Sequence, residues 1–237
     1  MIFGRTCDPV FRDLLELGKL WFRTDLLRAQ TQFESALTIL PGYAPALEGL
    51  GKSAAAKGET KAAIDYFTEA FRALPIAQYA IDLGEVYTAA GDSTKALQQY
   101  ALAEIAYERS TTSGVTTDLE YAMFLAEHDL KLPLALVKAR AAYAERPSIY
   151  GADVLAWALY KNGRAAEALP YLKKSLSLGG HDASLLYHAA LIQRELGEII
   201  QALDYLGKCI SLNRNFSIIH SHTVQNTFQN WQTIEED

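Results

Sequence analysis

Residues 46–53 read ALEGLGKS, which matches the loose spacing of a nucleotide-binding loop: a small residue, four spacers and then Gly-Lys-Ser. Such a loop holds phosphate with backbone N–H groups, and it needs a buried strand before it and a helix after it. Here PGYAP precedes the match, and Leu47, Leu50 and Gly51 have the spacing of positions inside a helix. Helical amides are bonded internally, so we do not expect ATP to bind there.

The histidines and cysteines offer little reactive chemistry. His220 and His222 form a His-x-His pair, but the same segment has no Cys, Asp or third His to complete a metal site. His188 lies among apolar residues and is interpreted as a hydrogen-bonded packing residue rather than a base. Cys7 and Cys209 stand near opposite ends and are expected to be unpaired thiols. The sequence therefore predicts no catalytic residues, no metal site and no cofactor, and the chain is not expected to be an enzyme.

Composition and charge narrow the possible partners. Half of the 237 residues are apolar and 21% are charged, which is typical of a soluble folded chain. The net charge is −6 and basic residues are scattered, so nucleic acid is not an expected partner. No stretch approaches the roughly 18 apolar residues of a membrane span, and membrane insertion is not expected. The N-terminal residues lack a signal-peptide core, which predicts a cytoplasmic location; a chain trimmed of a leader, and therefore extracytoplasmic, would look the same.

The chain is organised as a repeat of about 34 residues. Residues 50–70, LGKSAAAKGETKAAIDYFTEA, and residues 83–103, LGEVYTAAGDSTKALQQYALA, place Leu-Gly, Gly-acid, Ala, an aromatic and Ala at the same spacing. Six such units follow one another, and the fourth, from Asp118 to Pro147, keeps the pattern least well. The second unit shows the fixed positions most completely: Leu47, Leu50, Gly51, Gly58, Ala63, Phe67, Ala70 and Pro75.

Each unit is expected to be a pair of antiparallel helices, because apolar residues recur at three- and four-residue intervals. A glycine followed by a charged residue divides four of the pairs, where one helix must end and the chain must turn. These are Gly58-Glu59, Gly91-Asp92, Gly163-Arg164 and Gly197-Glu198, and the first unit is expected to turn at Thr24-Asp25. Gly51 and Gly84 stand where two helix axes come closest, and Phe67 and Tyr100 fill the space between neighbouring pairs.

This pattern resembles the tetratricopeptide repeat family over roughly residues 10–214. The resemblance implies an all-α fold, a right-handed α-solenoid of antiparallel helix pairs. We expect an N-terminal block of about three pairs over 1–109, a loop and possible hinge over 110–117, and a second block of three pairs over 118–214. Residues 215–237 are expected to form a capping helix and an acidic tail, which the open end of a solenoid needs.

In this family the first helices of the pairs line a concave groove that binds peptides. The family register places an aromatic set in the C-terminal half of that groove: Tyr121, Phe124, Tyr150, Asp153, Trp157, Tyr160, Tyr187, Leu191 and Arg194. We expect Trp157, Tyr150, Tyr160 and Tyr187 to anchor a partner, although any of these aromatics could instead be buried between helices. The N-terminal half is polar and somewhat acidic, with Glu48, Lys52, Gln78, Ile81, Asp82 and Glu85.

The function expected from the sequence is therefore a non-catalytic scaffold or adaptor that binds a protein or peptide segment in the groove. The alternative is a structural module that self-associates, either through its C-terminal helix or end to end, as a homo-oligomer. Some family members clamp a peptide carboxylate with basic residues. The equivalent positions here, among them Glu48 and Asp153, are acidic or apolar, so that clamp is not expected.

Overall fold

The computed structural model describes residues 9–113 and 116–236 of the chain. Over these residues the regular structure consists of thirteen α-helices and one short 3₁₀ helix, without a strand. The all-α fold of consecutive helix pairs expected from the sequence is confirmed. Among the described helices, none combines the length and the apolar character that a membrane crossing requires.

Contacts divide the chain into two units, each of which is described by itself. Unit 1 extends to Arg109 and also contains Asn215–His222, and unit 2 contains Ser110–Arg214 and the residues from Thr223 onwards. The segment 215–237, expected as a single cap, is thus shared between the two units. In the expected loop 110–117, the first three residues are helical and residues 114 and 115 lie outside the described part. A hinge at this segment stays a prediction.

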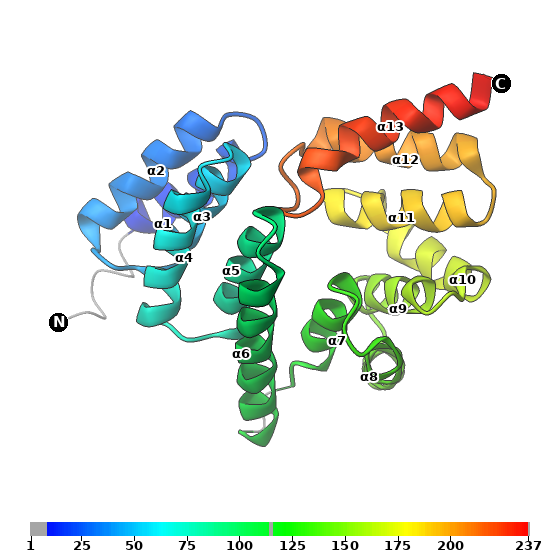
Figure 1. The fold of residues 1–237 in the computed structure, drawn as a ribbon, viewed down its shortest axis with the longest axis horizontal. Coiled ribbons are helices and arrows are strands. Elements are labelled where there is room, and N and C mark those ends of the chain that lie inside the picture. The colour runs from blue at the N-terminus through cyan, green and yellow to red at the C-terminus, as the bar shows by residue number, and fades with distance from the viewer. Residues whose placement is uncertain (1–8, 114–115, 237) are drawn as a thin grey trace. The chain divides into compact units, whose positions relative to one another are not determined.

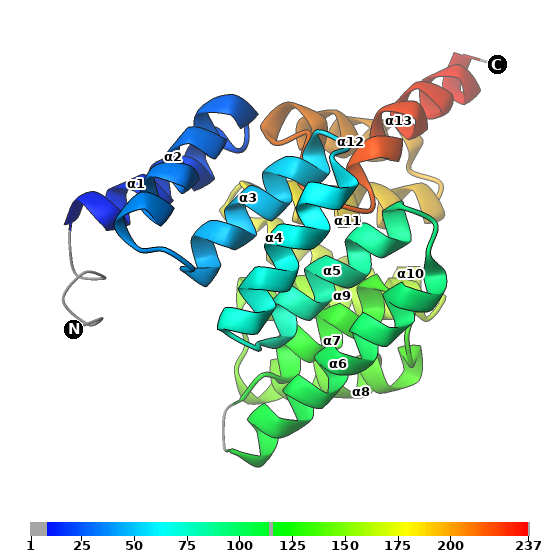
Figure 2. The same cartoon turned by 60° about the vertical axis from the view of Figure 1, so that its left-hand side comes forward.

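Unit 1 contains three helix pairs, which Figure 2 shows most clearly. The pairs are α1 (Pro9–Trp21) with α2 (Leu26–Ile39), α3 (Ala44–Ala56) with α4 (Thr60–Ala73), and α5 (Ala77–Ala89) with α6 (Ser93–Thr112). The first pair turns at Asp25, whose carboxylate accepts a hydrogen bond from the Arg28 amide at 3.0 Å and so caps α2.

The repeated glycines of unit 1 allow the helices to approach each other closely. The Phe67 ring of α4 is fully buried against α3, and a Cβ atom on Gly51 would lie 2.8 Å from that ring. Tyr100 of α6 packs on Gly84 of α5 in the same way, and its hydroxyl lies 3.0 Å from Thr88 Oγ1. The two glycines therefore lie where two helices approach closely, as expected, but each aromatic packs against the glycine of its own pair rather than only between neighbouring pairs. Phe67 also belongs to a cluster with Leu83 and Val86 of the next pair.

Unit 2 contains the other three pairs and most of the last helix (Figure 1). The pairs are α7 (Asp118–Glu127) with α8 (Leu132–Glu145), α9 (Ile149–Lys161) with α10 (Ala165–Ser175), and α11 (Ala183–Glu195) with α12 (Ile199–Leu212). A 3₁₀ turn, Leu176–Leu178, follows α10. Two reversals of unit 2 use glycine in the left-handed region, at Gly163 (φ 72°) and Gly197 (φ 82°). The reversal between α7 and α8 instead places Asp129 (φ 55°) and Lys131 (φ 42°) there.

The last helix, α13 (Ser221–Glu236), covers part of unit 2 from Thr223 onwards. Val224 is buried, and the Phe228 ring lies close enough to Gly207 of α12 that a Cβ there would be 3.4 Å away. The guanidinium of Arg194 lies 5.8 Å from the centre of the Trp231 ring. This part of the tail is therefore packed against its own chain.

Candidate functional site

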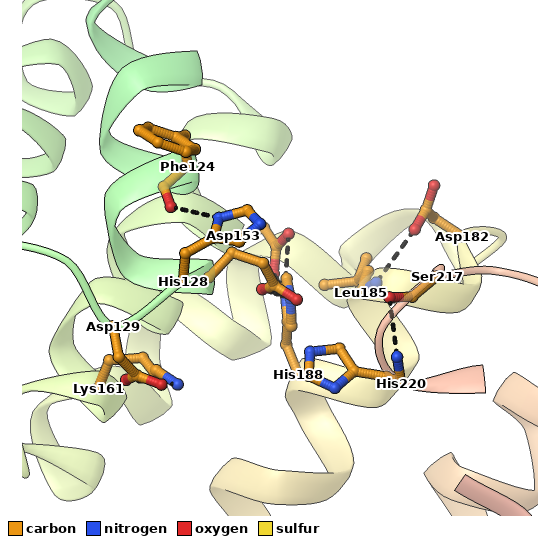
Figure 3. Close-up of polar contacts among 11 residues, drawn as sticks. Phe124, His128, Asp129, Asp153, Lys161, Asp182, Leu185, His188, Ser217 and His220 are labelled. Carbon is orange, nitrogen blue, oxygen red and sulfur yellow. Dashed lines mark hydrogen bonds and ion pairs between the residues drawn. The ribbon is translucent and has the colours of Figure 1, made fainter. Parts of the chain in front are cut away.

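The first helices of unit 2, α7, α9 and α11, lie next to each other and form one face, called here the unit 2 wall. Side-chain caps set where two of these helices begin. Ser148 Oγ accepts a hydrogen bond from the Gly151 amide at 2.9 Å. Asp182 accepts one from the Leu185 amide at 3.0 Å (Figure 3). The start of each helix fixes its rotation, and thereby which of its residues reach the wall.

A buried imidazole links the three helices of this wall. His188 Nδ1 of α11 lies 3.0 and 3.2 Å from the two carboxylate oxygens of Asp153 on α9, and Nε2 lies 3.6 Å from Glu127 Oε2 on α7 (Figure 3). His188 is only 3% exposed. The ring therefore joins one side chain from each first helix of the unit.

The charge state of His188 follows from this position. Burial by itself lowers the pKa of an imidazole, but the charge of Asp153, the hydrogen bond to Asp153 and the nearby carboxylate of Glu127 outweigh it and raise the pKa to about 10. His188 is then an imidazolium at neutral pH, and each ring N–H points to a carboxylate. A charged ring cannot accept a proton as a general base, so the interpretation of His188 as a packing residue is supported.

Aromatic rings continue the wall on both sides of this imidazole. The Trp157 ring stacks on His188 with centres 4.1 Å apart and planes 16° apart, and Tyr160 stacks on Trp157 at 5.0 Å and 20°. Tyr187 lies 6.4 Å from Trp157 at a tilt of 55°. Lys161 Nζ lies 5.3 Å from the Trp157 ring centre and pairs with Asp129 at 2.7 Å. Among the described residues, Trp157 Nε1 meets no hydrogen-bond partner.

The nine residues expected on this wall differ in exposure. Tyr121, Phe124, Asp153 and Trp157 are buried; Tyr160, Tyr187, Leu191 and Arg194 are partly exposed; Tyr150 is 46% exposed. The exposed and partly exposed members can contact a partner, whereas the buried members can only support them.

Two members of this site were not among the expected residues, Glu127 and His188. A signal for one of them was present in the sequence: Asp153 and His188 are 35 positions apart, close to one repeat, which places them on adjacent first helices.

The corresponding helices of unit 1, α3 and α5, called here the unit 1 wall, carry a polar set of side chains in place of the aromatic one. Lys52 forms an ion pair with Glu48 one turn earlier on α3. Asp82 of α5 is 2% exposed, and its Oδ1 accepts a hydrogen bond from Gln78 Nε2 at 2.9 Å. Charged groups and hydrogen bonds therefore replace stacked rings on this side of the chain.

The remaining reactive groups are accounted for structurally. Residues 46–53 lie within α3, and Ser53 Oγ donates to the Gly49 carbonyl at 2.8 Å, so these residues do not form a phosphate loop. Burial raises the pKa of the Cys209 thiol to about 12, which keeps it protonated; Cys7 lies outside the described residues. Within the described chain, no three His, Cys, Asp or Glu side chains converge as metal ligands.

A pocket of about 710 Å³ lies in unit 2, between the turn before α11 and the helices α12 and α13. Its charged residues, Asp204 and Lys208, pair with each other at 2.6 Å. A ligand site usually combines an apolar lining with polar groups that converge on the ligand, and this pair is already satisfied. The pocket is therefore a weaker candidate than the two walls.

Comparison with known proteins agrees with this architecture. The family model described as tetratricopeptide repeat matches residues 183–216, which are the sixth repeat of the sequence. The fold is that of a tetratricopeptide repeat array. No curated protein matches the sequence.

Solved tetratricopeptide repeat structures share the fold at low sequence identity. A tetratricopeptide repeat protein from Parabacteroides merdae is 16% identical, with a TM-score of 0.60, over 96% of this chain and 86% of that one. A chain of the hetero-tetramer Cut9–Hcn1 of the APC/C is 18% identical, with a TM-score of 0.54, over 94% of this chain and 43% of that one. The yeast protein Tom70 is 14% identical, with a TM-score of 0.55, over 97% of this chain and 48% of that one. This chain spans less than half of the last two, so these likenesses concern the fold alone.

Proposed function

We propose that the protein is a non-catalytic adaptor that binds a segment of another polypeptide on the unit 2 wall. Tyr150, Tyr160, Tyr187, Leu191 and Arg194 are the contact residues in this proposal, because they keep exposed surface. Tyr121, Phe124, Asp153 and Trp157 hold them in place from below. A repeat fold of this kind is generally an interaction scaffold, which supports the proposal without naming the partner.

One observation carries the proposal: two partly exposed tyrosines rest on a buried and charged stack. Tyr160 and Tyr187 both lie against Trp157, which is 1% exposed and is itself stacked on the imidazolium of His188. A ring that is already fixed loses little conformational entropy when a partner binds it. Tyrosine also offers a large contact area and is common at binding hot spots.

The tyrosine hydroxyl groups stay protonated on this wall. Burial, followed by the charges of Glu120, Asp153 and Asp182, raises the pKa of Tyr150 to about 12. Burial and the charge of Glu127 raise the pKa of Tyr187 further above its ordinary value. At neutral pH these groups can therefore donate hydrogen bonds, which suits the backbone carbonyls of an extended peptide.

The test begins with peptides selected from a random library on the full-length protein, and measures the affinity of one synthetic peptide by calorimetry. The double variant Tyr160→Ala/Tyr187→Ala should weaken binding about tenfold or more. The matched control is Tyr205→Ala on α12, a partly exposed tyrosine away from the wall. Equal affinity of the double variant and the wild type, with both folded by circular dichroism, would exclude this wall as the binding surface.

Self-association through the C-terminal segment is the alternative function. The packing of Val224 and Phe228 within unit 2 favours the adaptor, because these side chains are already used within the chain. Light scattering over a range of protein concentrations separates the two functions. A constant monomer mass is expected, whereas a concentration-dependent oligomer that disappears when residues 215–237 are removed would support self-association.

A further inference from the structure

The segment that leads into α13 belongs to unit 1, although the helix before it and most of the helix after it belong to unit 2. Contacts assign Asn215–His222 to unit 1, and they assign the chain up to Arg214 and from Thr223 onwards to unit 2. These residues, drawn in orange-red before α13 in Figure 1, are called here the strap. The strap is far from the helices of unit 1 in the sequence, yet it packs with them.

The strap contacts unit 1 through both polar and apolar side chains. Asn215 Nδ2 donates a hydrogen bond to the carbonyl oxygen of Phe22, just after the end of α1, at 3.4 Å. The last carbonyl groups of a helix have no donor within that helix, so an amide side chain suits this place. Ile218 packs against a buried cluster of α3, α4 and α5, whose members are Ala54, Ala63, Phe67, Leu83 and Val86. The strap therefore reaches all three helix pairs of unit 1.

Hydrogen bonds within the strap fix its shape. Ser217 Oγ accepts a hydrogen bond from the His220 amide at 3.2 Å (Figure 3). In return, Ser221 Oγ accepts one from the Ser217 amide at 3.0 Å. These reciprocal bonds close a turn directly before α13, in the manner of a helix capping box. Ile218 lies inside this turn, so its side chain is held ready for the cluster and loses little conformational entropy on contact.

The composition of the strap indicates which chemistry unit 1 selects. Residues 215–234 contain no Asp, Glu, Lys or Arg, whereas 21% of the whole chain is charged. The side chains that meet unit 1 at Phe22 and at the cluster are an amide and an aliphatic group. A site filled in this way selects an uncharged segment with one aliphatic side chain, rather than an ion pair.

The contacts of the strap are weak enough to be exchanged. None of the residues 215–222 is fully buried. The hydrogen bond from Asn215 to Phe22 is longer than the about 2.7–3.2 Å of most N–H···O bonds. Segments with few buried side chains are the ones that open locally while the rest of a protein stays folded. Local opening of the strap would expose the apolar cluster that Ile218 covers.

We propose that the strap occupies a binding site for a partner polypeptide on unit 1, and that the partner binds there by displacing the strap. The partner segment has the chemistry of the strap itself: an uncharged turn at the start of a helix, with an aliphatic side chain for the cluster and an amide for the Phe22 carbonyl. The strap is then an internal competitor that keeps the site closed until such a segment is present.

A second copy of this chain is a poorer occupant than a separate partner. The strap is tethered at both ends, because α12 precedes it and α13 follows it. Val224 of α13 is buried and Phe228 packs beside Gly207, both within unit 2 of the same chain. A tethered segment has an effective concentration on the order of millimolar at its own site. The strap of another copy would have to exceed this concentration while its α13 stayed in place.

The experiment uses the full-length protein and a fluorescent synthetic peptide of residues 213–222 with blocked ends. In the wild type the strap competes with this peptide for the site. In the variant Asn215→Ala/Ile218→Asp, both contacts of the strap are removed and the site is open. The peptide should therefore bind the variant about tenfold more tightly than it binds the wild type, measured by fluorescence anisotropy.

Controls connect this gain to the strap. The same peptide carrying Ile218→Asp should bind neither protein. Ile200→Asp on α12, at an isoleucine that is 72% exposed, is the matched control protein and should bind the peptide as the wild type does. If the double variant does not fold, Ile218→Ala alone should raise the affinity in the same direction, because it removes the packing and leaves the turn.

Nuclear magnetic resonance of methyl groups locates the bound peptide. The signals of Leu83 and Val86 in the cluster should shift as the peptide is added to the double variant. The signals of Leu191 on the unit 2 wall should not. Shifts at Leu191 without shifts at Leu83 and Val86 would place the peptide elsewhere and overturn the proposal.

Three further results would overturn it. The first is equal affinity of the wild type and the folded variant for the peptide, or binding to neither. The second is equal binding of the peptide with and without Ile218→Asp. The third is a wild type that is dimeric by light scattering when the double variant is monomeric, because the occupant would then be a second copy.

The proposal is separate from the unit 2 wall. The variant Tyr160→Ala/Tyr187→Ala should leave the affinity for this peptide unchanged. Failure of the strap site therefore leaves the adaptor proposal standing, and the reverse also holds.

Discussion

The two walls of this protein bury ionisable groups in opposite ways. In unit 2, His188 lies between Asp153 and Glu127, so its charge is balanced by this chain. In unit 1, Asp82 is as deeply buried, but among the described residues only its Oδ1 has a hydrogen-bond partner. Removing one partner of a buried ion pair leaves an uncompensated charge and is strongly destabilising, and a buried carboxylate without its full set of hydrogen bonds already carries part of that cost. We infer that the buried charge of unit 2 positions the rings of its wall, whereas the buried carboxylate of unit 1 is ionised only at a cost in stability.

The largest effect is expected where the balanced charge is removed. His188→Ala leaves Asp153 and Glu127 facing each other without a counter-ion and opens a cavity beside Trp157. The free energy of unfolding should fall by about 3–5 kcal/mol, measured by urea unfolding of the full chain. His181→Ala, at an exposed position in the same unit, is the control and should leave the urea midpoint unchanged. A loss below about 1 kcal/mol for His188→Ala would mean that the charge is not balanced there.

The pH dependence of stability gives a second, smaller test of the same charge. The pKa of His188 is raised from 6.5 to about 10 in the folded protein, so between these values the folded state holds a proton that the unfolded chain has released. The stabilisation is complete below pH 6.5 and is lost as the pH rises towards 10. Relative to His188→Gln, the wild type should lose about 2 kcal/mol between pH 6 and pH 9.5. Parallel curves for the two proteins would contradict the raised pKa.

Asp82 should show a pH dependence in a lower range, and here a substitution is expected to stabilise the protein. The pKa of this acid is raised from 3.8 to about 7, so the folded state binds the extra proton between these values and stability falls as the pH rises through them. Asp82→Asn keeps the acceptor for Gln78 but carries no charge. It should be more stable than the wild type by about 1–2 kcal/mol at pH 8, without an advantage at pH 4. A loss of stability at pH 8 would mean that the negative charge is already balanced.

The sequence predicts the helices of both walls well and their charges poorly. The repeat places Trp157, Tyr160 and Tyr187 near one another, because equal spacing puts equivalent residues on equivalent faces. It does not say that Trp157 is buried while Tyr150 is exposed, because depth depends on how each pair of helices is tilted against the next. The contact between His188 and Glu127 and the unpaired oxygen of Asp82 depend on such tilts. Distances of a few tenths of an ångström decide them, and a spacing rule has no information at that scale.

The smallest effect is expected for an ion pair that belongs to neither wall. Asp204 and Lys208 on α12 lie 2.6 Å apart, closer than His188 and Asp153, but their side chains are 54% and 59% exposed. Water already solvates both charges, so the pair gains little from contact. Asp204→Asn should leave the urea midpoint unchanged within error, measured beside His188→Ala and Asp82→Asn. A shift as large as that of Asp82→Asn would mean that distance rather than burial sets the energy of these pairs. The contrast drawn between the two walls would then have no physical basis, because it depends on burial.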